Sequence, residues 1–414
     1  MSGAVARGRA RSAHDIVGFD GLRALAALSV LAYHVAWRAN FRATDWFAPA
    51  LWELKAGVAI FFVISGALLY LPFARAMRDR RALPNWRDYA RRRAVRILPA
   101  YWVALTAVAV GPFHAGVFGP AAGRYYALSQ IYDLQTAFGG LKVAWSLCVE
   151  VSFYALLPVF ARVVGERASV RKQLSVIGAL GVGSLVLRAA LAGSLTGSFD
   201  GHGSALMVSL PGMLDWFAIG MALAVLRAEL EVARATRWSS ARPTLCVLVS
   251  LAAFAAVVLM QHQDLVLPWY GALDHATIGL GSGALVLAVI VARPDRRLRP
   301  LSHPVLVWIG TVSYGVYLWH LPALMLIAPH LLPRGGSASL AAVTLTWLAV
   351  VAAAVALGAA SWYLVERPVQ RIFGAQRRRA DGRDTPGRVS DRGDGVHSTL
   401  DPLNSSGVAV DHLA

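Results

Sequence analysis

Residues 20–34 read Asp-Gly-Leu-Arg-Ala-Leu-Ala-Ala-Leu-Ser-Val-Leu-Ala-Tyr-His, an apolar stretch that contains Arg23 and His34. At ~100° per residue, the eleven positions from Arg23 to His34 make about three helical turns, so both side chains share one face, ~16 Å apart along the axis. A charged or titratable group in hydrocarbon costs at least a few kcal/mol, so such residues usually line a cavity or a reaction path. The pair therefore predicts a functional site inside a membrane helix.

The composition supports a membrane protein. Of the 414 residues, 57% are hydrophobic and only 15% are charged, whereas soluble domains contain about 25% charged residues. Apolar runs of about 20 residues match the hydrocarbon thickness. We therefore expect an all-α, polytopic integral membrane protein with about ten transmembrane helices. The expected spans lie near residues 17–37, 55–73, 97–114, 147–165, 174–193, 206–227, 243–261, 271–292, 305–329 and 339–365.

A net charge of +17 is typical of nucleic-acid-binding proteins, but the placement of the basic residues argues against such a partner. They precede the first span, fill every second connection and follow the last span, for example at 7–11, 75–96 and 377–379. This alternation is typical of the positive-inside rule. We expect both termini on the cytoplasmic side and a multi-pass location in the bacterial cytoplasmic membrane.

The sequence predicts one transmembrane domain, residues 17–373, between two cytoplasmic tails. Residues 1–16 form the N-terminal tail. Residues 374–414 are rich in Arg, Asp, Gly and Ser, a composition typical of a disordered tail. The two cysteines, Cys148 and Cys246, fit no metal-ligand spacing, so we expect no metal.

Glu150 is the first candidate partner of His34. It opens the fourth expected span on the outer side, where His34 closes the first, so we expect the two to meet. A carboxylate bonded to one imidazole nitrogen fixes the tautomer and raises basicity, as in a general base. In the alternative interpretation, each is an ordinary polar residue at the membrane interface.

Arg92, Arg93 and Arg96 cluster at the inner mouth of the third span. On a helix 92 and 96 share a face and 93 and 96 are neighbours, so the cluster can hold phosphates through bidentate contacts. Charge alone favours the alternative, an ordinary positive-inside signal or contact with anionic headgroups.

Asp215 in the sixth span and His320 in the ninth are further polar groups in apolar surroundings. Intramembrane Arg, His and Asp would also suit a transporter or flippase of a lipid-linked sugar. That alternative predicts inverted repeats and broken helices, which the sequence does not display.

Several motifs together resemble the membrane-bound acyltransferase-3 family of O-acyltransferases. They occur in the family's order and cover residues 19 to about 368. One departure is Cys148, where the family commonly has serine. The motifs are Arg23 with His34, Phe61-Phe62-Val63-Ile64-Ser65-Gly66, Arg92-Arg93 with Arg96, Trp145-Ser146-Leu147 with Glu150 and Phe153-Tyr154, Ser313-Tyr314 with Tyr317, and Glu366.

The resemblance implies transfer of an acyl group, expected to be acetyl, from acyl-coenzyme A to a hydroxyl of a carbohydrate, glycolipid or glycosylated metabolite. It implies catalytic roles for His34, Glu150 and Arg23, and a donor site at Arg92, Arg93 and Arg96. Membrane lipid is a further expected partner. The remaining candidates, expected to contact substrate, are Asp20, Trp145, Tyr154, Asp215 and His320.

Overall fold

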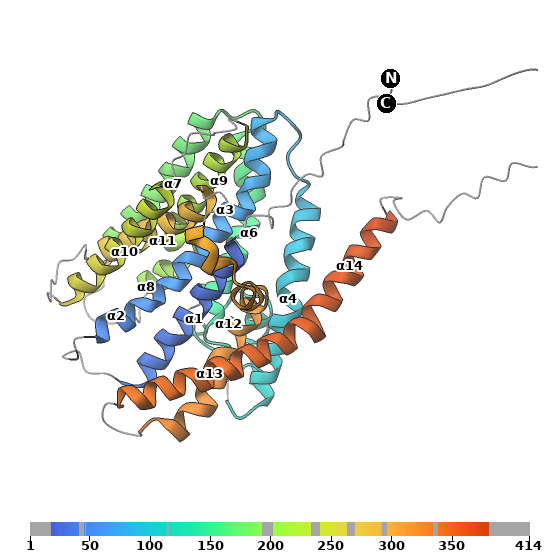
Figure 1. The fold of residues 1–414 in the computed structure, drawn as a ribbon. Helices are drawn as coiled ribbons and strands as arrows, with labels where there is room; N and C mark the ends of the chain where they lie inside the picture. Colours follow the sequence, from blue (N-terminus) through green and yellow to red (C-terminus); the bar gives the residue numbers. More distant parts are fainter. Residues whose placement is uncertain are drawn as a thin grey trace, which may run out of the picture. The chain divides into compact units, whose positions relative to one another are not determined.

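The protein is helical throughout the part that the structure describes. In this computed structural model, ten helical segments are long and apolar enough to cross a membrane, which confirms the predicted fold class (Figure 1). The described residues are 18–40, 45, 47–113, 116–133, 135–192, 202–232, 241–262, 270–291, 296–333 and 338–380.

Seven of the ten spans are single helices, and three combine two or more elements. The single helices are α1 (Phe19–Arg38), α4 (Trp86–Val110), α6 (Ala144–Val164), α7 (Val170–Ala192), α10 (Ala241–His262), α11 (Tyr270–Val291) and α12 (Pro304–Leu331). The composite spans are α2 (Ala48–Trp52) with η2 (Glu53–Ala56) and α3 (Gly57–Arg78), α8 (His202–Met207) with α9 (Leu210–Val232), and α13 (Leu340–Ser361) with η5 (Trp362–Glu366) and α14 (Arg367–Ala380). Shorter elements are α5 (Ala122–Tyr126), η3 (Gln130–Tyr132) and η4 (Arg296–Ser302).

The third span begins well before the predicted residue 97. The Asn85 side chain accepts hydrogen bonds from the backbone N–H groups of Arg87 and Asp88, at 2.9 and 3.3 Å. This N-cap starts α4 at Trp86. The basic cluster therefore lies on the helix itself, within its first three turns, and the mean hydropathy of the apolar part alone could not locate this start.

The predicted C-terminal tail differs from the structure in its first residues. Helix α14 continues to Ala380, past residue 373 where the tail was expected to begin. Residues 374–380 include Ala, Gln and Arg, which favour helix. Residues 381–414 and the predicted N-terminal tail lie outside the described residues, so the domain boundaries stay a prediction.

Helix α1 packs closely on α12, and small residues allow this approach. A Cβ atom added to Gly310 would lie 1.9 Å from the carbonyl oxygen of Asp20. One added to Gly21 would lie 2.0 Å from the carbonyl oxygen of Leu301, in η4. Backbone contacts of this kind hold membrane helices together, because van der Waals packing drives their association. They set the N-terminal part of α1, which carries Arg23, against α12 and η4.

The Gly310→Ala variant should lose stability for this reason. The added methyl group meets backbone, which cannot rotate away, so we expect a loss of about 1–3 kcal/mol and lower activity. The thermal midpoint in detergent is the measurement. Gly183→Ala in α7 is the matched control, because its Cβ would have no neighbour within 4 Å. An unchanged midpoint for Gly310→Ala would contradict the close α1–α12 packing.

The buried apolar side chains form two clusters. The larger one joins α3, α4, α6 and α9, with Tyr70, Tyr101, Phe153 and Phe217 among its fully buried side chains. The smaller one joins α1, α12 and α13. Polar residues on α1, α3, α4, α6 and α12 face a cavity between these helices.

Candidate active site

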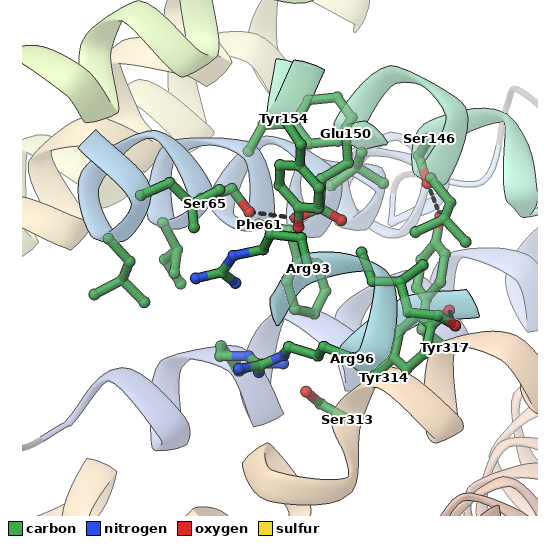
Figure 2. Close-up of a pocket in the computed structure, with 18 residues that line it drawn as sticks. Phe61, Ser65, Arg93, Arg96, Ser146, Glu150, Tyr154, Ser313, Tyr314 and Tyr317 are labelled. Atoms are coloured by element: carbon green, nitrogen blue, oxygen red, sulfur yellow. Dashed lines mark hydrogen bonds between the residues drawn. The ribbon is translucent and has the colours of Figure 1, made fainter. Parts of the chain in front are cut away.

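A cavity of about 120 Å³ lies between α1, α3, α4, α6 and α12 (Figure 2). Its wall combines apolar side chains with an unusual number of charged and hydroxyl groups for a membrane interior. The polar lining residues are Arg23, Ser65, Arg93, Arg96, Ser146, Glu150, Tyr154, Ser313, Tyr314 and Tyr317.

Three arginines give the cavity a positive charge. Arg93 and Arg96 lie one turn apart on α4, and Figure 2 shows both projecting into the cavity. Arg23 lines the same cavity from α1. The Arg93 guanidinium lies over the ring of Tyr154, 5.7 Å from its centroid, which is within the range of a cation–π contact.

Glu150 is the carboxylate of this cavity, and it pairs with Ser65. The Ser65 hydroxyl donates a hydrogen bond of 2.5 Å to the Glu150 carboxylate (Figure 2). One carboxylate against three guanidinium groups leaves the lining positive. Such a site attracts an anionic ligand, and guanidinium forks match phosphate oxygens.

Two tyrosines of α12 connect the cavity wall to α4 and α6. Tyr314 donates a hydrogen bond of 2.9 Å to the carbonyl oxygen of Ile97 on α4. The hydroxyls of Tyr317 and Ser146 are hydrogen bonded at 2.6 Å, which ties α12 to the start of α6. These bonds fix the width of the cavity at this end.

His34 and His320 form a pair next to Tyr317. His320 Nε2 lies 3.3 Å from His34 Nδ1, with the ring centroids 5.0 Å apart. His34 Nδ1 also lies 2.9 Å from the carbonyl oxygen of Val30. His320 Nδ1 lies 2.7 Å from the carbonyl oxygen of Tyr317, and the two rings are in contact at 5.5 Å.

The predicted contact between His34 and Glu150 is therefore wrong. Glu150 lies nearly two turns inside α6 and bonds Ser65 on α3, whereas His34 bonds His320 on α12. The reason is helix packing, because α1 packs closely against α12 and presents His34 to that helix. The outer position of both residues is not enough to bring them together.

Asp215 belongs to a second buried cluster, on α7, α9 and α11. His275 Nε2 lies 2.9 Å from its carboxylate, and the Ser184 hydroxyl donates to the same oxygen at 3.2 Å. The His275 ring stacks on Trp216 with a centroid distance of 4.0 Å. Asp215, a predicted substrate contact, is thus bonded to His275 and Ser184, and it does not line the cavity.

The other predicted site residues divide between the cavity and its surroundings. Tyr154 lines the cavity, whereas Asp20, Arg92 and Trp145 are not among its lining residues. Arg92 is exposed, and Asp20 and Trp145 are half-buried. Within the described residues, no group of three or more His, Cys, Asp or Glu side chains could hold a metal ion.

Sequence reasoning missed two functional groups of the cavity and one partner outside it. In the sequence, Ser65 and Ser146 stand out only as members of the family motifs. His275 was overlooked, although an Asp-His pair at 274–275 inside an apolar run is a visible signal. A polar residue within a membrane span indicates a functional site in the same way as Arg23 and His34 do.

The family model and the named relatives that match this chain agree with one another. A family model described as an acyltransferase domain matches residues 16–366. The chain is 30% identical over 332 residues to the Bacillus subtilis (strain 168) protein "Putative peptidoglycan O-acetyltransferase YrhL", with 76% of this chain and 49% of the relative covered. It is 27% identical over 343 residues to "Peptidoglycan O-acetyltransferase OatA" of Listeria monocytogenes, with 76% and 50% covered.

A third relative is matched over most of its length. This is "Exopolysaccharide production protein ExoZ" of Rhizobium meliloti, 28% identical over 336 residues, with 78% of this chain and 91% of the relative covered. The chain spans about half the length of the two peptidoglycan relatives. No solved structure matches the chain. With ten membrane-spanning segments and a family match over most of its length, the chain belongs to the acyltransferase-3 family of membrane-bound O-acyltransferases.

Proposed function

We propose that the protein transfers an acetyl group from acetyl-coenzyme A to a hydroxyl group of an envelope carbohydrate, a glycolipid or a glycosylated metabolite. The observation that carries this proposal is that Tyr317 connects the cavity to the histidine pair. Tyr317 lines the arginine-containing cavity, and its ring contacts His320, which is paired with His34. Two of the relatives are named peptidoglycan O-acetyltransferases and the third an exopolysaccharide production protein, which supports acetyl transfer to a carbohydrate.

The donor would bind through its phosphates at Arg93 and Arg96, with Arg23 as a third cation. The positive-inside pattern predicts that the N-terminal end of α4 faces the cytoplasm, where acyl-coenzyme A is made. Because Glu150 and Arg93 interact electrostatically with Arg96, the carboxylate reduces repulsion between the guanidinium groups while the site is empty. We therefore assign Glu150 to the donor site, in place of the predicted role beside His34.

The distance between Arg23 and His34 explains why the cavity matters. The two lie ~16 Å apart along α1, whereas reacting atoms must approach to about 3–3.5 Å. A donor anchored at the arginines has a long, thin pantetheine arm. If this arm follows the cavity toward Ser146 and Tyr317, its thioester arrives next to the histidine pair. Direct transfer requires the arm to extend past Tyr317, because neither histidine lines the cavity.

His34 would act as the general base. It takes the proton of the acceptor hydroxyl while that oxygen attacks the thioester carbonyl carbon. The C–S bond then breaks, and the coenzyme A thiolate takes the proton back from His34. His34 is half-buried near the predicted outer end of α1, so an acceptor on the extracytoplasmic side would reach it.

The proposal is tested by measuring free thiol release from purified protein in lipid nanodiscs. The donor is acetyl-coenzyme A, and the acceptors tested are muropeptides, exopolysaccharide oligosaccharides and glycosylated small molecules. We expect thiol release that depends on one acceptor class, with a matching acetyl mass increase on that acceptor. If the protein instead moves a lipid-linked sugar across the vesicle membrane and releases no thiol, it is a flippase.

A further inference from the structure

We infer that His320 is the positioning residue of His34: its Nε2 accepts a hydrogen bond from His34 Nδ1–H and, together with the Val30 carbonyl, keeps His34 Nε2 free to take the proton of the acceptor. The inference rests on the proposed function, because it concerns the base of that reaction. In this inference the neutral His320, rather than Glu150, is the partner of His34. The role of His320 changes from the predicted substrate contact to orientation of the base.

The protonation of both rings follows from their carbonyl partners. A carbonyl oxygen can only accept a hydrogen bond. His34 Nδ1, 2.9 Å from the Val30 oxygen, must therefore carry a proton. His320 Nδ1, 2.7 Å from the Tyr317 oxygen, must carry one as well.

The hydrogen bond between the two rings can then run in only one direction. In a neutral imidazole only one nitrogen is protonated, so His320 Nε2 has a free lone pair. It lies 3.3 Å from His34 Nδ1, so the His34 Nδ1–H donates a bifurcated hydrogen bond to the Val30 carbonyl oxygen and to His320 Nε2. His34 Nε2 is thus left as the basic nitrogen of the pair.

The surroundings hold His320 in this orientation. Its side chain is only 1% exposed, and its ring packs on Tyr317, which Ser146 fixes by a hydrogen bond of 2.6 Å. In the part of the chain that the structure describes, neither histidine ring is hydrogen bonded to a carboxylate. A neutral acceptor avoids placing a second charge beside the imidazolium in an apolar environment, where ionised groups are costly.

The chemical step keeps all atoms in balance. The acceptor oxygen forms a bond to the acetyl carbonyl carbon as its proton moves to His34 Nε2. The resulting imidazolium retains its Nδ1–H bonds to Val30 and His320. The thioester C–S bond then breaks and the thiolate takes the proton from Nε2, so both histidines end as they began.

Two amide substitutions separate the two hydrogen bonds of His320. Glutamine places its terminal amide near the position of Nε2, so His320→Gln keeps an oxygen that can accept from His34. Asparagine is shorter and reaches only the position of Nδ1, so His320→Asn keeps the bond to Tyr317 and loses the one to His34. Both variants keep a polar, uncharged side chain, which makes them a matched pair.

The test measures acetyl transfer and the His34 tautomer in the full-length protein. We expect His320→Asn to lower kcat about 10–100-fold, the range seen when a histidine ligand of a metal loses the partner that orients it, with the KM for acetyl-coenzyme A unchanged. His320→Gln should stay within about threefold of wild type. Thermal midpoints in detergent show whether each variant is folded.

The second readout needs no turnover. In ¹⁵N-histidine spectra, with His34 assigned by difference from His34→Gln, wild type should show the Nδ1–H tautomer. In His320→Asn the Nδ1–H fraction should fall, because only the Val30 carbonyl remains as its acceptor. Equal kcat in His320→Asn and wild type, equal losses in both variants, or an unchanged tautomer in His320→Asn would overturn the inference. Absence of thiol release in wild type would instead overturn the proposed function, while the tautomer still reports on the pair.

Discussion

Replacing His34 with alanine is expected to lower kcat for acetyl transfer by about 10²–10⁴, the range that general bases contribute. The loss follows from the removal of the nitrogen that takes the acceptor proton. Acetyl-coenzyme A binding should be unchanged, because His34 does not line the arginine cavity. Steady-state thiol release gives kcat, and equilibrium binding of the labelled donor gives the affinity.

Membrane insertion should survive this change, because removing a polar group makes a span more apolar. His330→Ala is the matched control. It removes another histidine near the end of α12, but one that is exposed, so we expect activity close to that of wild type. Wild-type kcat in a well-folded His34→Ala protein would exclude His34 as the base.

The apolar runs of the sequence were enough to predict the fold class. Runs of about 20 residues indicate spanning helices because the bilayer leaves no other way to satisfy the backbone, and all ten predicted spans have a counterpart. The start of α4 was not predictable from hydropathy. It depends on the Asn85 cap, and a cap of this kind is a local hydrogen bond that an average over many residues hides.

The residue types of the site were predictable, but their partners were not. The spacing of Arg23 and His34 placed both on one face of α1, yet Arg23 lines the cavity while His34 bonds His320. Which helix packs on α1 decides this, and that packing depends on small residues such as Gly21 and Gly310. A single sequence shows these glycines without showing the helix they meet.

The three clustered arginines illustrate the same limit within one helix. Helical spacing makes Arg92 and Arg96, and also Arg93 and Arg96, neighbours. Only Arg93 and Arg96 line the cavity, and Arg92 is exposed. The sequence alone does not give the rotation of α4 about its axis, so it could not tell which two of the three would face inward.

Arg93→Lys and Arg96→Lys should each raise the KM for acetyl-coenzyme A about tenfold. Lysine keeps the positive charge but loses the planar fork that bonds two phosphate oxygens at once. A loss of ~1.4 kcal/mol of directed hydrogen bonding corresponds to a factor of ten in affinity. The KM for the acceptor should change little, since its hydroxyl reacts at the His34 end. Steady-state kinetics in a fixed lipid mixture give both constants.

Arg92→Lys is the control that gives this experiment its meaning, because it makes the same chemical change one residue away on the exposed side of α4. If the arginines act through directed contacts in the cavity, Arg92→Lys keeps the wild-type KM while the other two variants lose affinity. If the cluster serves only as a topology signal or a headgroup contact, lysine replaces arginine at all three positions without a change in donor kinetics. That outcome would move the donor site away from the arginine cavity. An equal rise in KM for all three would show that the whole cluster, and not the inward-facing pair, binds the donor.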